Sequence, residues 1–461
     1  MLKRLHRCMA GVATLSVAFA AGCGGAGAGS SSGVMVPAGP ALPAPAARIG
    51  HKIQHVVIII QENRSVDNLF HRFPGADTVD YGKSSKGKLV ALLPEPLDKP
   101  MDIDHRHVAF VTEYDGGKMD GFDLVQSHCN KNAGSRCRQS DPHAYGYVPE
   151  KQIKPYWTMA EDYTLADHMF QTNQGPSFPA HQYLVSGTST ISNQSPLWAA
   201  ENPHDKGVSG SGGCDSKPGT LVSVIDPQGQ ENRQVFPCFT RVSLMDRITA
   251  KGLTWRYYQA HIGRGLWNAP DAIRNVRYGP LYSTDVVAPA KRVLDDVVAG
   301  DLANVVWVTP TRAASDHPGV TDGSGPSWVA SIVNAIGKSQ YWDDTAIFIT
   351  WDDWGGWYDH VAPRQLNAYE LGFRVPLIVV SPYAKQHYIS HDEHEFGSIL
   401  KFTERAFGMT PLHTTDVRAD DLFDCFDFTK PATRFRPVSA PLGRDYFLAQ
   451  PTSNADPDDD W

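Results

Sequence analysis

The stretch TAIFITWDDWGGWYDH, residues 345–360, begins as a buried strand and ends on two acids. It is continuously apolar from Ala346 to Ile349, the pattern of a strand covered on both faces. Asp352 and Asp353 follow, and the Gly-Gly pair after them allows a sharp turn. Ligands of open α/β sheets bind just beyond the carboxyl ends of strands, where paired carboxylates suit a divalent cation. A solvated turn is the competing interpretation.

A second apolar run also ends on oxygen-bearing side chains. Residues 54–60 read QHVVIII, and Glu62 and Asn63 come directly after this run. On its own, this pattern indicates a turn capped by Asn63. When Asp352 and Asp353 are considered as well, the pattern favours one metal site formed by both strand ends. A carboxylate and an amide oxygen are ligands that hard cations prefer.

Further apolar runs and helical patterns alternate along the chain. This alternation predicts an α/β fold, a three-layer αβα sandwich with a mostly parallel central sheet, although the order of the strands cannot be read from it. Residues 190–240 are polar and are expected to form loops. The additional strands are expected at 304–309 and 375–380, and the helices at 244–248, 328–336 and 394–407.

Residues 172–181, TNQGPSFPAH, predict a loop that opens a helix with Pro179 in its first turn. A serine at a helix start is usually an N-cap. It can also be a nucleophile, because backbone N–H groups there stabilise an anion. Both roles stay open for Ser177. The pattern is not G-x-S-x-G, so a nucleophile elbow of the lipase kind is not supported.

Two histidines in loops are candidates for contact with a ligand. His105 lies in DIDHRH (102–107) and His317 in SDHPG (315–319), after a predicted strand; a structural or surface role is the alternative for each. Such rings can bind a phosphate oxygen or protonate a leaving group. A hydroxyl such as that of Ser177 loses its proton more easily beside a metal. The set favours metal-assisted attack on phosphorus.

Six stretches together resemble the bacterial phosphoesterase family of phospholipases C and respiratory-burst-inhibiting acid phosphatases. They are HVVIIIQENRSVDNLF (55–70), DIDHRH…GGKMDGF (102–122), GPSFPAHQYLVSGTS (175–189), SDHPG (315–319), TWDDWGGWYDHV (350–361) and GFRVPLIVVSPYA (372–384). The family's fold is similar to that of alkaline phosphatase and arylsulfatase.

The resemblance also implies roles for individual residues. It implies one divalent metal ion of unknown identity, a serine nucleophile that also touches this metal, and histidines that contact phosphate. The implied metal ligands are Glu62, Asn63, Ser177, Asp352 and Asp353, and the implied phosphate-binding residues are Asn63, His105, His317 and, as a weaker candidate that could merely support its loop, His360.

Three departures from the family's pattern affect the substrate. Phospholipases of this family usually carry Asp-Glu where this chain has Asp352 and Asp353, many members have Thr in place of Ser177, and Asn often stands where this chain has Ala180. A phosphatase acting on monoesters and a phospholipase C acting on phospholipid diesters therefore both stay open. The alternative is an exported metal- and phosphate-binding protein without turnover, and the intact Ser177 favours the enzyme.

The N-terminal residues 1–22 have the pattern of a signal peptide. A positive start is followed by a short apolar core at 12–21, too short to span a bilayer. Ala-Ala-Gly before Cys23 resembles a lipoprotein cleavage box, with Ala20 where Leu is usual. We expect a periplasmic or extracellular protein, with lipid anchoring at Cys23 and plain secretion as alternatives. A flexible tether (23–47), a single catalytic domain (48–450) and a disordered acidic tail (451–461) complete the prediction.

Charge and cysteine content bound the partners and the redox state. The 461 residues carry a formal net charge of −8 with no basic run, which argues against nucleic acid as partner, and nothing implies a protein partner. Export would permit disulfides among the seven cysteines. Local spacing favours the pairs Cys129–Cys137 and Cys214–Cys238, with Cys425 left buried and free.

Overall fold

The computed structural model describes residues 49, 52–129, 143–205 and 212–453. The chain divides into two compact units, Met1–Ala44 and Pro45–Trp461, and only the second contains described residues. The predicted signal peptide, the tether, Cys23 and residues 454–461 of the predicted tail lie outside them. Among the helices of the described ranges, none combines the length and apolar character that a membrane crossing requires.

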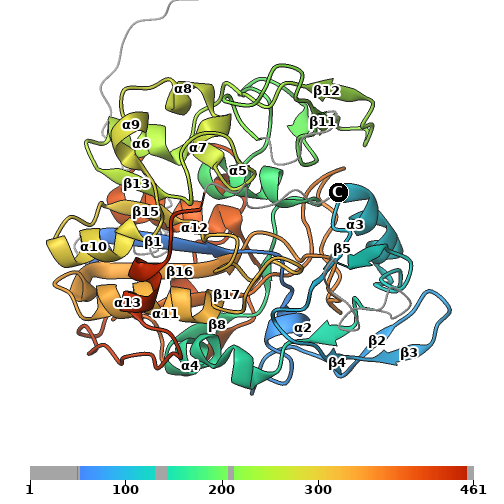
Figure 1. Ribbon diagram of the computed structural model, residues 1–461, viewed down its shortest axis with the longest axis horizontal. Coiled ribbons are helices and arrows are strands. Elements are labelled where there is room, and N and C mark those ends of the chain that lie inside the picture. Colours follow the sequence, from blue (N-terminus) through green and yellow to red (C-terminus); the bar gives the residue numbers. More distant parts are fainter. Residues whose placement is uncertain (1–48, 50–51, 130–142, 206–211, 454–461) are drawn as a thin grey trace, which may run out of the picture. The chain divides into compact units, whose positions relative to one another are not determined.

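The described residues form a central eight-stranded sheet (Figure 1). Only β17 among these strands runs antiparallel to both neighbours, so the prediction of a mostly parallel sheet is confirmed. The order is β14 (Val286–Val287), β13 (Trp255–Tyr258), β15 (Val305–Val308), β1 (His55–Gln61), β16 (Thr345–Trp351), β17 (Leu377–Val380), β8 (Thr164–Ala166) and β18 (Tyr388–Ser390).

Helices cover both faces of this sheet. On β16 the ring of Phe348 lies 5.0 Å from that of Phe402, in α12, and the ring of Trp351 lies 5.0 Å from that of Tyr156, in α4. Strand side chains alternate between faces, so residues three apart point to opposite sides. The three-layer prediction is confirmed. One layer holds α4 (Lys154–Asp162), α10 (Arg292–Ala299), α11 (Gly325–Gly337) and α13 (Arg444–Ala449), and the other α5 (Ser177–Ser186), α6 (Leu244–Ala250), α7 (Ala269–Ala272) and α12 (Phe396–Phe407).

The two central strands β1 and β16 end level with each other. They pair in parallel over seven residues, from His55 opposite Thr345 to Gln61 opposite Trp351. Their apolar positions are fully buried, because helices cover both faces. The backbone N–H of Asp352 donates to the carbonyl of Gln61 at 3.0 Å, which extends the ladder past both strands. The residues that follow the two strands are therefore neighbours.

Residues 190–240 differ from the loop prediction, because part of them forms a small three-stranded sheet. It consists of β10 (Trp198–Ala199), β11 (Val222–Ile225) and β12 (Arg233–Val235). Strands this short carry too few residues for a readable alternation, and a buried cluster around Phe178 and Trp267 supports them. The predicted disulfide Cys214–Cys238 is present and Cys425 is buried and free, as expected, whereas Cys137 lies outside the described residues.

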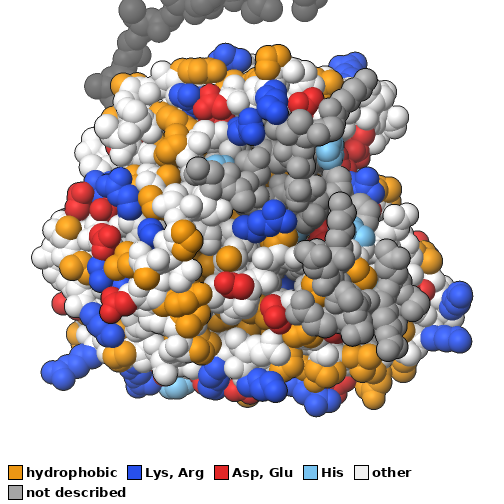
Figure 2. Space-filling view, in the orientation of Figure 1, with side chains coloured by type: hydrophobic (Ala, Val, Ile, Leu, Met, Phe, Trp, Pro, Cys, Tyr) orange, Lys and Arg blue, Asp and Glu red, His pale blue; other side chains and the backbone are white. Residues whose placement is uncertain are grey.

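The other elements of the described residues are mostly short. The predicted helix at 394–407 begins only at Phe396, because the two preceding residues pair as a strand. Figure 2 shows acidic and basic side chains interspersed over the described part of one face. The remaining α-helices and strands are α2 (Val66–Leu69), β2 (Tyr81–Lys83), β3 (Leu89–Ala91), β4 (Leu93–Pro94), β5 (Met101–Ile103), α3 (His107–Tyr114), β6 (Ser127–Cys129), β7 (Gly146–Tyr147), β9 (Met169–Phe170), α8 (Arg274–Arg277), α9 (Tyr282–Asp285) and β19 (His394–Glu395).

Candidate metal centre and nucleophile

The acids after β1 and β16 lie together, as their positions predicted. Glu62, Asp352 and Asp353 have no exposed surface. The backbone N–H of Asn63 donates to Oδ1 of Asp352 at 3.0 Å, and Asn63 has a φ of 62°, in the left-handed region that asparagine tolerates better than most residues. This turn places the two strand ends in direct contact.

Gly355 is required where the β16 turn approaches the β1 turn. Its φ is +63°, and a Cβ atom there would lie 2.4 Å from the carbonyl oxygen of Asn63. Its N–H donates to Oδ1 of Asp353 at 2.8 Å. The glycine therefore permits both the close backbone approach and the fixed orientation of this carboxylate.

Ser177 is the first residue of α5, and its hydroxyl points at the acids. The N-cap of this helix is Pro176, and the Ser177 side chain makes no capping bond. Its Oγ instead donates to Oδ2 of Asp353 at 3.2 Å. The structure therefore does not show the capping role that the sequence left open, and it brings the predicted nucleophile to the predicted metal site.

His181 joins this group, although the sequence analysis did not single it out. Its Nε2 lies 3.2 Å from Oε1 of Glu62 and 3.6 Å from Oδ2 of Asp352, and ligand atoms of all three lie within 4.8 Å of one another. His181 follows Ser177 by four residues in the helix, so the two share a face. This four-residue spacing is the feature of the sequence that could have identified His181 as a site residue.

His105 and His317, the two histidines predicted to contact phosphate, lie beside each other. Their ring centroids are 6.1 Å apart. Nδ1 of His105 lies 2.7 Å from the carbonyl of Ile103, and Nδ1 of His317 lies 2.7 Å from that of Pro318. A carbonyl only accepts, so each Nδ1 is the donor and the neutral rings carry their acceptor at Nε2.

The side-chain amide of Asn63 connects His105 to the acids. Its Nδ2 lies 3.1 Å from Nε2 of His105, while its backbone contacts Asp352. Six of the eight predicted residues, namely Glu62, Asn63, Ser177, Asp352, Asp353 and His105, thus lie at or contact the two strand ends. His317 joins them by packing against His105.

His360 is the predicted residue that makes its contacts elsewhere. Its Nδ1 lies 2.7 Å from Oδ2 of Asp67 and its Nε2 3.1 Å from Oδ1 of Asp77. Burial opposes its charged form, but the hydrogen bond and charge of Asp67 outweigh burial and raise the pKa of His360. These contacts match the alternative in which His360 supports its loop.

The electrostatics of the strand ends fit a divalent cation. Burial, and then the charge of Asp352, raises the pKa of Asp353 well above its usual range. Oδ2 of Asp352 and Oδ1 of Asn63 are buried and, within the described residues, accept no hydrogen bond. Buried charges without compensation are costly. The donors are mostly oxygens, the ligands of hard cations, so Glu62, Asn63, Ser177, Asp352 and Asp353, with His181, could hold such an ion.

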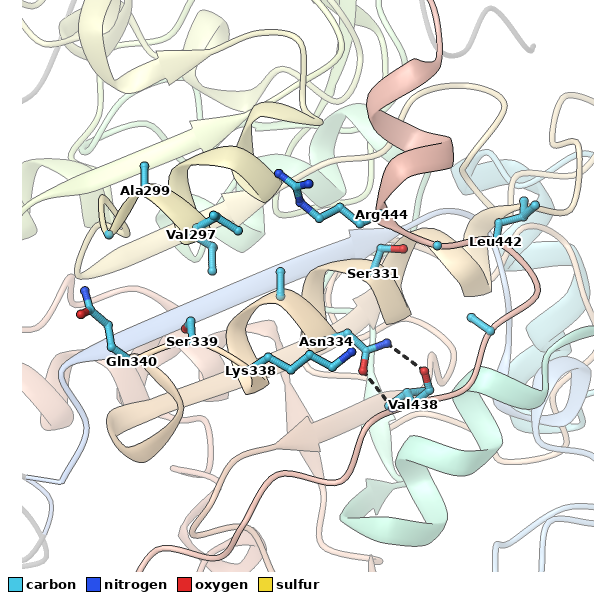
Figure 3. Close-up of a pocket in the computed structure, with 15 residues that line it drawn as sticks. Val297, Ala299, Ser331, Asn334, Lys338, Ser339, Gln340, Val438, Leu442 and Arg444 are labelled. Atoms are coloured by element: carbon cyan, nitrogen blue, oxygen red, sulfur yellow. Dashed lines mark hydrogen bonds between the residues drawn. The ribbon is translucent and has the colours of Figure 1, made fainter.

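A pocket on the helical layer lacks this chemistry. Figure 3 shows it between α10, α11 and the segment before α13, lined by residues such as Asn334 and Lys338. Its residues 299–300 and 338–340 precede β15 and β16, so the pocket lies toward the amino ends of the strands. The side chains predicted to react lie at the opposite ends.

Known proteins resemble the chain over most of its length. Non-hemolytic phospholipase C of Pseudomonas aeruginosa is 26% identical over 439 residues, covering 82% of this chain and 58% of that protein. Phospholipase C A of Mycobacterium tuberculosis is 26% identical over 458 residues, covering 85% and 80%. The chain therefore spans little more than half the length of its Pseudomonas relative.

Solved structures show only a distant likeness. A protein of the alkaline phosphatase superfamily from Vibrio parahaemolyticus matches with a TM-score of 0.40 and 11% identity, covering 84% of this chain and 72% of that one. At this TM-score the likeness gives no independent support for the fold. The model of the Phosphoesterase family matches residues 53–410, which include the strand-end acids, Ser177 and both histidines. The chain belongs to the phosphoesterase family.

Proposed function

We propose that this chain is an exported, metal-dependent phosphoric ester hydrolase that uses Ser177 as nucleophile and forms a phosphoserine intermediate. The observation that carries the proposal is the 3.2 Å contact between Oγ of Ser177 and Oδ2 of Asp353, among buried carboxylates at two strand ends. A family match over residues 53–410 supports the reaction class.

The position of Ser177 favours negative charge on its oxygen. Asp353 fixes the direction of Oγ by accepting its hydrogen bond. The N-terminus of α5 stabilises an anion at this oxygen and on the phosphoserine that follows. A divalent ion held by the strand-end acids would supply Lewis-acid stabilisation of negative charge.

The two histidines bind oxygen atoms of the phosphate or protonate the leaving group. Because each Nδ1 already donates to a backbone carbonyl, protonation places the second hydrogen on Nε2. The imidazolium then offers a donor in a fixed direction, which suits an oxyanion or the oxygen of a departing alcohol.

The reaction has two steps. In the first, the bond between Oγ and phosphorus forms, the ester P–O bond breaks, and the alcohol leaves with a proton. In the second, water attacks phosphorus and gives up a proton, the bond between Oγ and phosphorus breaks, Oγ regains a proton, and phosphate or a phosphate monoester is released. A phospholipase C type of substrate is supported by the names of the relatives, and a phosphatase type by the Asp352-Asp353 pair.

A chelator experiment tests the metal and the reaction together. Hydrolysis of nitrophenyl phosphate, bis-nitrophenyl phosphate and phosphatidylcholine is measured before and after chelator dialysis, and again after return of divalent metal. We expect turnover of at least one ester, its loss on dialysis and its recovery. Full turnover in the metal-free protein contradicts the metal. Metal and phosphate binding without turnover of any ester supports the alternative binding function.

Export is tested separately. Mass spectrometry of the protein from cell fractions should show a chain that lacks residues 1–22. If Cys23 is lipidated, the protein partitions into detergent and Cys23→Ser releases it. A single acyl chain binds membranes only marginally, so stable anchoring requires a diacyl modification. A wild type wholly in the aqueous phase supports plain secretion, and an uncleaved cytoplasmic chain contradicts export.

A further inference from the structure

We propose a second metal site, for a divalent transition ion such as Zn²⁺, formed by Asp167, His168 and His391. Asp167 and His168 directly follow β8, and His391 directly follows β18. The two strands pair in parallel with Ala166 opposite Ser390, so the three residues meet at the carboxyl ends of these strands. The site uses the same sheet edge as the strand-end acids but a different pair of strands.

The geometry brings three side chains that can bind zinc close together, two imidazoles and one carboxylate. One ligand atom from each residue lies within 4.8 Å of the others. Nδ1 of His391 lies 2.8 Å from Oδ1 of Asp167, and the two imidazole rings have centroids 5.9 Å apart. Two imidazoles and a carboxylate are a frequent protein ligand set for zinc, with water in the fourth position.

Neighbouring groups hold these side chains in place. The side chain of Asp167 is fully buried, and its Oδ2 accepts from the backbone N–H of Asp77 at 2.7 Å. Nε2 of His168 lies 3.0 Å from Oδ2 of Asp77, and the carbonyl of Asp167 accepts from Nη1 of Arg374 at 3.0 Å. A carboxylate that orients an imidazole is the usual outer-sphere support of a metal-binding histidine.

The local charge also favours a cation. The carboxylates of Asp67, Asp77 and Asp359 lie around the single guanidinium of Arg374. The carboxylate of Asp167 lies beside them, because its Oδ2 accepts from the backbone N–H of Asp77. Even with a charge on His360, the carboxylates outnumber the cations in this cluster. A divalent ion would balance the excess.

The surroundings differ from those of a reaction centre. The side chain of His391 is 55% exposed, so an ion and its water ligand can enter directly from solvent. The ion would link strands β8 and β18, at the end of the sheet, to the loop that contains Asp77, because Asp77 contacts His168. We therefore assign this site a stabilising role, independent of the proposed hydrolase reaction.

Metal counting on four variants of the full mature protein tests the site. Chelator-treated wild type, Asp352→Asn, His391→Ala and the double variant are dialysed against Zn²⁺ and measured by mass spectrometry. We expect His391→Ala to bind one ion fewer than wild type, and the double variant one fewer than Asp352→Asn. Loss of a direct ligand should weaken zinc at this site by more than about a hundredfold, since loss of outer-sphere support alone costs about 10–100-fold.

Controls separate the site from misfolding and from the strand-end acids. His387→Asn, at an exposed histidine whose φ of 53° asparagine tolerates, should bind as much zinc as wild type. Circular dichroism confirms folding, and His168→Ala provides a second test if His391→Ala unfolds. Because each comparison is made within one background, it holds even if the strand-end acids bind no zinc. Equal zinc content and affinity with and without His391 and His168 overturn the proposal.

Discussion

Two pairs of parallel strands end in candidate metal-binding side chains, but the burial of these side chains differs. β1 and β16 are seven-residue strands in the middle of the sheet, and the acids after them have no exposed surface. β8 and β18 have three residues each and lie at the end of the sheet, and His391 after them is half exposed. The same topology therefore gives one site shielded from water, where electrostatic effects are strong, and one open to water.

The largest expected effect separates chemistry from stability at the shielded site. Ser177→Ala should lower turnover by several orders of magnitude, because the attacking oxygen is lost. The melting temperature should hardly change, since Ser177 makes no capping bond. Steady-state kinetics and thermal unfolding of the same sample measure both.

Ser186→Ala is the matched control, because Ser186 is a buried serine at the other end of the same helix. It should keep normal turnover. Near-normal turnover of Ser177→Ala would mean that water attacks phosphorus directly and that the assignment of the nucleophile is wrong.

The next effect concerns metal at the two strand-end sites. Glu62→Gln or Asp352→Asn should reduce both bound metal and turnover, because each removes a negative charge from the shielded site. Added metal should raise the unfolding free energy of the wild type by about 2.7 kcal/mol at a hundredfold excess over the dissociation constant, and by less in these variants. His391→Ala should change turnover little, since the contacts of His391 are with Asp167 and His168 and not with the strand-end acids. If turnover depends on His391 and not on Asp352, the catalytic role assigned to the strand-end acids and the stabilising role assigned to the site at His391 are both wrong.

The buried cation beneath the open site should control stability. Arg374 is fully buried, and its Nε and Nη2 bind both oxygens of Asp359 at 2.8 and 3.1 Å. Arg374→Met should lower the free energy of unfolding by about 3–5 kcal/mol, because it leaves buried carboxylates uncompensated. Urea unfolding measures this loss.

Arg364→Met serves as the control, because this arginine pairs with Glu393 at an exposed position. Removal of a surface ion pair should cost about 0–1 kcal/mol. Equal losses in the two variants would show that the charge network around Arg374 contributes no more than a surface pair.

The long central strands were predictable from sequence because they are continuous apolar runs, and so was the position of the candidate site after them. Residues 54–60 and 345–351 carry enough consecutive buried positions to reveal strands, and the acids directly after them reveal the site. Ser177 was predictable as a helix start, although only the structure shows which of its two roles its contacts support.

The open site could not be predicted, because its strands are too short. Three residues carry no readable alternation, so nothing marked Asp167 or His391 as strand-end residues. The order of the sheet places their strands together across more than two hundred residues of sequence, and no local pattern encodes that pairing. His181 is an intermediate case. The sequence shows that it lies four residues after Ser177, but only the structure shows its contacts with Glu62 and Asp352.

A further expected effect is a pH dependence of stability at the loop that carries His317. Oδ2 of Asp316 accepts hydrogen bonds from Tyr156 at 2.8 Å and from Trp351 at 2.9 Å. Burial raises the pKa of Asp316 to about 6, against the opposing charge of Arg64. The folded chain therefore keeps this proton up to about pH 6, whereas the unfolded chain releases it near the ordinary value of about 3.9. Between these values the folded state binds more protons, so stability falls as pH rises, by about 3 kcal/mol in total.

Asp316→Asn removes this titration while its amide oxygen can still accept both hydrogen bonds. Urea unfolding at intervals from pH 4 to 7.5 should show a decline in wild type that the variant lacks, with the two curves diverging only below about pH 6. Asp322→Asn, at an exposed aspartate in the same loop, should follow the wild-type curve. If all three curves stay parallel, Asp316 is ionised throughout the range, and Arg64 compensates its burial more strongly than the contacts around it suggest.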